Sequence, residues 1–265
     1  MSFGCVPSNR KLPKALKEVS GVARLANGTT YWINDGGNIA EVFLDAIPRK
    51  GAKSFSVSFK NVDWEAMTVY QDSLLCICDI GDNRRRREKI SIAIVNVAGT
   101  VLQERNLRYA DRPSNAEACA IKNEKLYILT KNRMQKGGSN KNSSANLYTI
   151  DLQQPDSILT LRDSLILPQR SVTDMAWLAS DKLAIVAYDF RRKGPFIKTL
   201  TSVFTVEIEK DDHFRENTLR ESKVRAPFTW TQYECILPIG NNEVIIASEN
   251  TRLFPARWRV VTLPN

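Results

Sequence analysis

Short runs of alternating apolar and polar residues recur along the chain. Each recurrence opens on a small or acidic residue followed by apolar ones, and a turn rich in Asn, Asp, Gly and Ser leads into a strongly apolar run. A polar loop then precedes a further alternating run. Alternation with a period of two predicts β-strands. The five recurrences begin between 45 and 60 residues apart, at Ser20, Glu65, Glu117, Asp174 and Glu234.

Four short strands fit each recurrence, which predicts an all-β fold, a β-propeller with four antiparallel strands per blade. After the opening strand, second strands are expected at 30–34, 74–79, 126–130, 183–188 and 244–248. Third strands are expected at 41–44, 89–95, 146–152, 202–208 and 257–263. Outer strands are expected at 54–59, 101–109, 159–167 and 223–228.

The last recurrence ends before an outer strand, and residues 10–17 can supply one by pairing the two chain ends. Such pairing closes the ring and leaves no long free edge. Five openings favour five blades, while a six-bladed ring with one degenerate blade and a β-sandwich remain alternatives. We expect a single domain over residues 10–265, preceded by a flexible tail over residues 1–9.

The composition, 43% hydrophobic and 25% charged, is typical of a globular domain. We expect a monomer without a membrane span, because no apolar run reaches the length that a span needs. The chain has one histidine, His213, which excludes a multi-histidine metal site. His213 lies in a strongly polar run, so we expect it at the surface.

The five cysteines are irregularly spaced. Cys76 and Cys78 lie two apart in an expected strand, point to one face and are not expected to bridge each other. Cys119 and Cys235 have apolar neighbours and are expected to be free thiols that pack as small hydrophobes. Cys5, after Ser-Phe-Gly, resembles the end of a bacterial lipoprotein signal. Two hypotheses stay open: an envelope protein anchored through Cys5, and a cytoplasmic protein with a disordered tail.

The opening acids carry the candidate chemistry. In a propeller the innermost strands begin at one face, the top, so Glu65, Glu117, Asp174 and Glu234 should gather around the central channel. Asn34, Asp79 and Lys131, at the ends of second strands, should reach the same place.

Three interpretations of this cluster are open. The carboxylates accept backbone hydrogen bonds; or they hold a hard divalent cation, most simply Ca²⁺; or a pair of them hydrolyses a glycosidic bond. The candidate metal ligands are Glu65, Asp79, Glu117, Asp174 and Glu234. The candidate catalytic acids are Glu65, Glu117 and Glu234. Trp64, Trp230 and Tyr233 could stack on a sugar, although these side chains also suit packing between blades.

The positive charge is concentrated in the loops between second and third strands. These loops carry a net charge of +10, and the rest of the chain carries −1. The densest run is Arg84 to Arg87, next to Asn83. The loops form either a solvated rim or a face that attracts an anionic ligand or protein. Nucleic acid is not expected, because no aromatic residues are interleaved with these arginines.

Two pairs of segments resemble a largely uncharacterised family of bacterial β-propeller proteins. Val-Ser-Gly-Val-Ala at 19–23 and Asn-Asp-Gly-Gly-Asn at 34–38 form the first pair. Asp-Trp-Glu-Ala-Met at 63–67 and Asp-Ile-Gly-Asp-Asn-Arg at 79–84 form the second. Gly36 and Cys78 depart from the family pattern, which has serine and glycine there. The resemblance implies the propeller fold and export of many members, and it implies little chemistry.

Together these observations predict a scaffold that binds a ligand or partner through a top face with a central acidic cluster and a basic rim. The cofactor that the cluster would accept is Ca²⁺. The alternative is a glycosidase-like hydrolase that uses the central carboxylates, so whether the protein is an enzyme stays open.

Overall fold

The structure is a computed structural model. It describes residues 10–44, 53–131, 142–155, 157–168, 170–179, 181–193, 196–225, 231–251 and 254–264. Within these ranges the regular secondary structure consists of β-strands, as the alternating patterns predict. No helix in the described ranges is long and apolar enough to cross a membrane. The expected tail, including Cys5, lies outside the described residues, as does Trp230.

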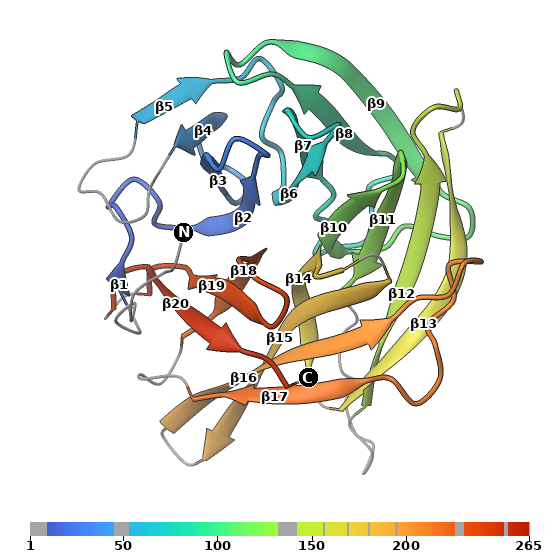
Figure 1. The fold of residues 1–265 in the computed structure, drawn as a ribbon. Helices are drawn as coiled ribbons and strands as arrows, with labels where there is room; N and C mark the ends of the chain where they lie inside the picture. The colour runs from blue at the N-terminus through green and yellow to red at the C-terminus, as the bar shows by residue number, and fades with distance from the viewer. Residues whose placement is uncertain are drawn as a thin grey trace.

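The strands form antiparallel meanders in chain order, arranged around a central axis (Figure 1). The first meander consists of β2 (Val19–Arg24), β3 (Thr30–Asn34), β4 (Glu41–Leu44) and β5 (Lys53–Ser56). A second four-stranded sheet consists of β14 (Ser171–Trp177), β15 (Lys182–Lys193), β16 (Phe196–Glu207) and β17 (Arg220–Val224).

Eight strands between these two sheets are joined in one sheet. It contains a meander of β6 (Trp64–Tyr70), β7 (Leu74–Asp79), β8 (Ile90–Val95) and β9 (Val101–Tyr109). It also contains a meander of β10 (Ala116–Lys122), β11 (Lys125–Thr130), β12 (Asn142–Asp151) and β13 (Ile158–Pro168). The outer strands β9 and β13 join them through a short parallel pairing, with Arg108 opposite Ile158 and Tyr109 opposite Leu159. Each half of this sheet keeps the expected four antiparallel strands, and the link between the halves forms because these two outer strands run on far enough to meet.

The last sheet joins the two chain ends. It has the order β1 (Arg10–Lys11), β20 (Arg257–Thr262), β19 (Glu243–Ser248) and β18 (Tyr233–Pro238). The pairing extends through a hydrogen bond of 2.9 Å from the Leu12 N–H to the Ala256 carbonyl. The expected closure by the N-terminal segment is present. The paired strand is shorter than expected, because Leu12 and Leu16 turn inward and are buried with Trp258.

The innermost strands β2, β6, β10, β14 and β18 pack side by side in this order, and β18 packs against β2. The core consists of buried apolar clusters, each lying between consecutive meanders. Each innermost strand also carries a register shift near its first residues. A bulge of this kind leaves one residue unpaired and re-aims its side chain.

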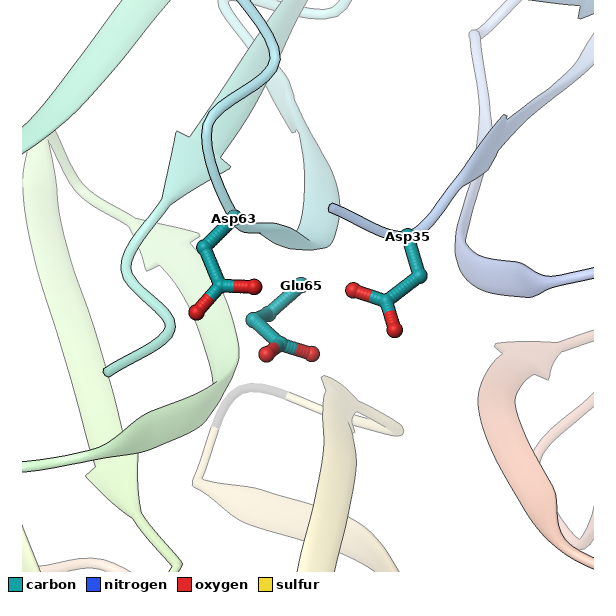
Figure 2. A group of neighbouring side chains, drawn as sticks. All are labelled: Asp35, Asp63 and Glu65. Carbon is teal, nitrogen blue, oxygen red and sulfur yellow. The ribbon is translucent and has the colours of Figure 1, made fainter. Parts of the chain in front are cut away.

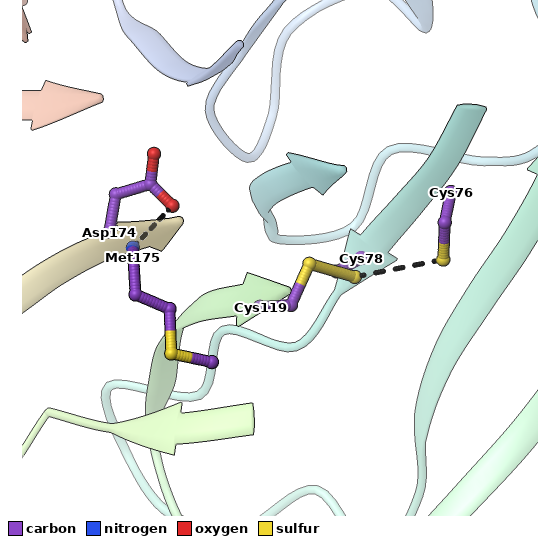
Figure 3. The surroundings of a disulfide bond; sticks show 5 residues. All are labelled: Cys76, Cys78, Cys119, Asp174 and Met175. Carbon is purple, nitrogen blue, oxygen red and sulfur yellow. Dashed lines mark hydrogen bonds between the residues drawn. A yellow bond between two sulfur atoms is a disulfide. The ribbon is translucent and has the colours of Figure 1, made fainter. Parts of the chain in front are cut away.

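The expectation that Cys119 is a free thiol is wrong (Figure 3). Cys78 in β7 and Cys119 in β10 form a disulfide between neighbouring meanders, with their Cα atoms 6.9 Å apart. Only the packing of one meander on the next brings these residues together. Cys76 and Cys235 are buried free thiols, and the Cys76 sulfur lies 4.0 Å from that of Cys78. His213 is exposed, as expected.

Candidate functional site

The bulges turn one residue of each innermost strand toward the channel. In β6, Trp64 pairs with Asp79 and Ala66 pairs with Cys78, which leaves Glu65 between them without a partner in the ladder. The other four innermost strands repeat this arrangement. The bulged residues are Ser20, Glu65, Glu117, Thr173 and Glu234. All five line a central cavity of about 110 Å³, which is room for several water molecules.

The fourth position corrects the sequence analysis, which aligned Asp174 with the other acids. The bulge of β14 leaves Thr173 unpaired, so Thr173 and not Asp174 faces the cavity. The Asp174 carboxylate instead accepts hydrogen bonds of 2.8 Å from the backbone N–H groups of Met175 and Ile236. It joins β14 to β18, and this geometry fits the interpretation of a structural acceptor.

We call the five bulged residues the bulge ring. The two of them that carry hydroxyl groups, Ser20 and Thr173, bind the neighbouring strand. Ser20 donates a hydrogen bond of 3.1 Å to the carbonyl of Trp64, and Thr173 donates one of 2.8 Å to the carbonyl of Tyr233. The three glutamates are longer and extend into the cavity.

Residues after the second strands complete the cavity wall. They are Asp35, Asn83, Lys131 and Glu249, and Tyr188 and Gln232 lie beside them. We expected opening acids to lie close to residues at the ends of the second strands, and Glu65, Glu117 and Glu234 do line the cavity together with Lys131. Asn83, a candidate ligand-binding residue, also lines it. Asn34 is buried, does not line the cavity, and donates a hydrogen bond of 2.8 Å to the carbonyl of Ala15.

Lys131 neutralises one side of the cavity. Its ammonium group lies 2.9 Å from Glu117 Oε2, and the Asn115 amide donates to Glu117 Oε1 at 2.7 Å. Burial alone would lower the pKa of Lys131, but the carboxylates of Glu117, Glu234 and Glu65 outweigh it, and the net shift is upward. Glu117 is therefore a satisfied ion-pair partner.

The opposite side holds a group of carboxylates that form no ion pair with a lysine or arginine among the described residues (Figure 2). Oxygens of Asp35, Asp63 and Glu65 all lie within 4.8 Å of one another. Glu65 is 7% exposed, and no donor among the described residues forms a hydrogen bond to its carboxylate. The three carboxyl groups point toward one another in the figure. We call Asp35, Asp63 and Glu65 the acidic trio.

Burial and mutual repulsion favour protonation of these groups. Burial, reinforced by the charges of Glu117, Asp35 and Asp63, raises the pKa of Glu65 well above its usual value. Burial raises the pKa of Asp35 to about 7, although the Gly36 N–H partly offsets the shift. The pKa of Asp63 is raised by burial, and the charge of Arg87 opposes that rise. A bound cation would relieve the same repulsion.

Asp79 positions the trio without joining it. Its Oδ2 accepts hydrogen bonds from the N–H groups of Val62, at 2.8 Å, and Asp63, at 3.1 Å, while its Oδ1 pairs with Arg87. Gly81 packs so closely on Asp63 and Glu65 that a Cβ there would collide with both carboxylates. The segment 79–84 is therefore a support for the acids, and Asp79 is fully engaged as an acceptor.

The aromatic candidates do not form a stacking platform in the described structure. Trp64 is fully buried against Phe59 and donates to the Lys60 carbonyl at 3.1 Å. Tyr233 is fully buried in the cluster between β14–β17 and β18–β20. Neither lines the cavity. Trp230 lies outside the described residues.

The basic rim is described only in part. Arg84, Arg85 and Arg86 are exposed beside Asn83, whereas Arg87 is turned inward to Asp79. The sequence analysis did not include Asp35 and Asp63 among the candidate ligands, although both lie in the segments that carried the family resemblance. The available signal was their position, one residue after β3 and two residues before the Glu65 bulge.

Comparisons with known proteins support the fold. No protein-family model and no curated protein matches the chain. A crystal structure of the exo-β-1,3-galactanase from Phanerochaete chrysosporium with β-1,3-galactotriose has a TM-score of 0.55 and 10% identity, over 92% of this chain and 60% of that one. This chain thus spans less than two thirds of that protein.

Two further structures are similar over nearly the whole chain. The PQQ-bound aldose sugar dehydrogenase from Streptomyces coelicolor has a TM-score of 0.52 and 7% identity, over 97% of both chains. A gluconolactonase from Xanthomonas campestris has a TM-score of 0.49 and 14% identity, over 97% of this chain and 89% of that one. The galactanase and the dehydrogenase, whose TM-scores exceed 0.5, resemble this chain in fold alone at these identities, and the chain has an all-β, β-propeller-like fold.

Proposed function

We propose that this protein is a five-bladed β-propeller that binds Ca²⁺ in its central cavity and presents the ion to an anionic ligand at the top face. The observation that carries the proposal is the Glu65 carboxylate. It is buried, lines the cavity, lacks a hydrogen-bond donor among the described residues, and faces two further carboxylates within 4.8 Å. An arrangement that brings several negative charges close together is stabilised by a hard cation.

Five blades are supported by the bulge ring. Each of the five innermost strands repeats one bulge at the same position, and the five pack in a closed cycle. The parallel pairing of β9 and β13 then joins the outer edges of two blades and leaves their inner strands independent members of the ring.

An anionic ligand is supported by what surrounds the trio. Ca²⁺ takes about 6–8 oxygen ligands, so three carboxylates leave positions for water and for ligand oxygens. Asn83 lines the cavity, and the exposed guanidinium groups of Arg84, Arg85 and Arg86 follow it directly in the chain. These groups would attract an anion toward the ion from the rim.

The hydrolase alternative has less support. The trio converges on one point, whereas a glycosidase needs a pair of carboxylates flanking a sugar. Tyr188 is the one aromatic side chain among the described residues of the cavity wall, and the cavity of about 110 Å³ is small for a sugar ring. The galactanase and the sugar dehydrogenase share the fold at 7–10% identity and carry no chemistry over to this chain.

Calcium binding can be tested on the chelator-treated, full-length protein. Isothermal titration with CaCl₂ should show a single site, and saturation should raise the free energy of unfolding. At about 100 times the dissociation constant the gain is roughly 2.7 kcal/mol, which corresponds to about 5–10 °C in the melting temperature of a domain of this size. Asp63→Asn should abolish the response, because it removes one of the three carboxylates. The fold should tolerate the substitution, since Asp63 is half-buried and its carboxylate makes no hydrogen bond among the described residues.

The matched control is Asp211→Asn, the same substitution at an exposed position, which should keep the full response. A native protein whose melting temperature and titration heat are indifferent to millimolar Ca²⁺, Mg²⁺ and chelator would overturn the proposal. Steady hydrolysis of aryl glycosides that Glu65→Gln removes would transfer the site to the alternative.

A further inference from the structure

A second cavity opens farther along the same innermost strands, at the end of the channel opposite the acidic one. It measures about 310 Å³, at the lower end of the usual range for small-molecule sites, about 300–1,000 Å³. In β2 the acidic cavity touches Ser20, whereas the second cavity touches Val22 to Arg24. In β6, β14 and β18 the same two-residue step separates the two linings. The channel is therefore polar at one end and mainly apolar at the other.

The lining of the second cavity is mainly apolar, and Arg24 and Thr68 are its polar side chains. Its walls include Val22, Met67, Val69, Met175 and Trp177. Methionine side chains adapt to varied apolar shapes, and a tryptophan offers a flat surface with one polar N–H. Such a wall accepts a compact aromatic or branched aliphatic group.

Arg24 supplies a charge at this cavity. Its Nε donates a hydrogen bond of 3.2 Å to Thr30 Oγ1, and in the described part of the chain it forms no ion pair with a carboxylate. Burial lowers the pKa of the guanidinium group, since a partly buried cation lacks a compensating anion. A guanidinium group is well suited to bind a carboxylate through two parallel hydrogen bonds.

Trp177 supplies a flat apolar surface at this cavity. Its Nε1–H is buried and has no hydrogen-bond acceptor among the described residues. The ring is held by edge-on contact with Tyr127, with centroids 5.2 Å apart, and by the Lys122 ammonium group 4.4 Å above it. Because this N–H is enclosed by protein atoms, Trp177 offers a ligand the surface of its ring.

We propose that this second cavity binds a small monocarboxylic acid with a compact apolar body. The carboxylate pairs with Arg24, and the apolar body lies among Met67, Met175 and Trp177. The site is independent of the acidic trio, because the two cavities share no lining residue.

The probe for this site is 2-naphthoate, and 2-naphthalenemethanol is its neutral counterpart. Binding to the full-length protein is measured by isothermal titration and by the indole N–H resonances of the ¹⁵N-labelled protein, with Trp177→Phe identifying the resonance of Trp177. We expect naphthoate to bind at least about tenfold more tightly than the alcohol, as one charge-assisted hydrogen bond implies, and to shift the Trp177 resonance.

Arg24→Gln should weaken the binding of naphthoate to the affinity of the alcohol. Arg24→Lys keeps a positive charge and should retain part of the preference for the acid over the alcohol. The second variant therefore separates the loss of charge from a loss of folding. Arg108→Gln, at an exposed position of the outer strand β9 that lines neither cavity, is the control and should bind like the native protein. Equal affinity for acid and alcohol, unchanged binding by Arg24→Gln, or absence of binding at millimolar naphthoate would each overturn the proposal.

Discussion

The carboxylate of Asp174 in β14 accepts a hydrogen bond of 2.8 Å from the backbone N–H of Ile236 in β18. The contact lies one residue beyond the bulge that points Thr173 into the channel. An acid that sequence alone places among the channel residues thus joins two neighbouring innermost strands. The distinction between the two roles can be measured.

Asp174→Ala should lower the free energy of unfolding by about 1–3 kcal/mol, because it leaves the buried N–H groups of Met175 and Ile236 without an acceptor. Urea denaturation measures the loss, and the increase in melting temperature on adding Ca²⁺ should remain. A neutral substitution, or one that removes the calcium response, would show that Asp174 belongs to the cavity after all.

Glu249 should make stability depend on pH. Burial first, and then the charges of Glu234, Asp35 and Glu18, raise its pKa from 4.5 to about 8. The folded state therefore binds this proton more tightly than the unfolded state, and the free energy of unfolding falls as pH rises from about 4.5 to about 8.

Glu249→Gln removes this dependence, so the variant should gain stability relative to the native protein as pH rises across that window. We expect a gain of about 1–2 kcal/mol at pH 9, limited by solvent screening because Glu249 is partly exposed. Denaturation is compared between pH 5 and 9 in the presence of chelator. Glu216→Gln, at an exposed position, is the control, and the expectation fails if both variants follow the same curve.

The Cys78–Cys119 disulfide should be detectable as a pair of protected thiols. Alkylation of the denatured, oxidised protein should modify three of the five cysteines, and reduction should release the other two. The bond spans 41 residues, so in the chain-entropy account its loss lowers the free energy of unfolding by up to about 4 kcal/mol. Five reactive thiols without reductant would contradict the bond.

Leu16 should anchor the closure of the ring. Its side chain is fully buried in the cluster that also contains Trp32 and Trp258. Leu16→Ala should cost about 2–5 kcal/mol, the range for truncating a buried leucine. Ile39→Ala, at a side chain 77% exposed, should be nearly neutral in the same denaturation experiment. If the two variants are equally stable, the segment after β1 contributes little to closure.

Alternation of apolar and polar residues was sufficient to predict most strands. The expected second strands at 30–34 and 74–79 coincide with β3 and β7, and the pairing of the chain ends follows from a missing outer strand. These features are local, because a strand with one buried face records its own pattern in the residues that form it.

Features that depend on pairing register or on contacts between distant segments required the tertiary structure. A one-residue bulge decides whether Thr173 or Asp174 faces the channel, and neither side-chain chemistry nor spacing reveals it. Packing between meanders joins Cys78 to Cys119, and the turn held by Asp79 brings Asp63 to Glu65 and Asp35. Tryptophan is a residue type that often stacks on sugars, yet the ring of Trp64 is buried between blades. The reason is its pairing with Asp79, which directs Trp64 to the core, while the bulge directs Glu65 to the channel.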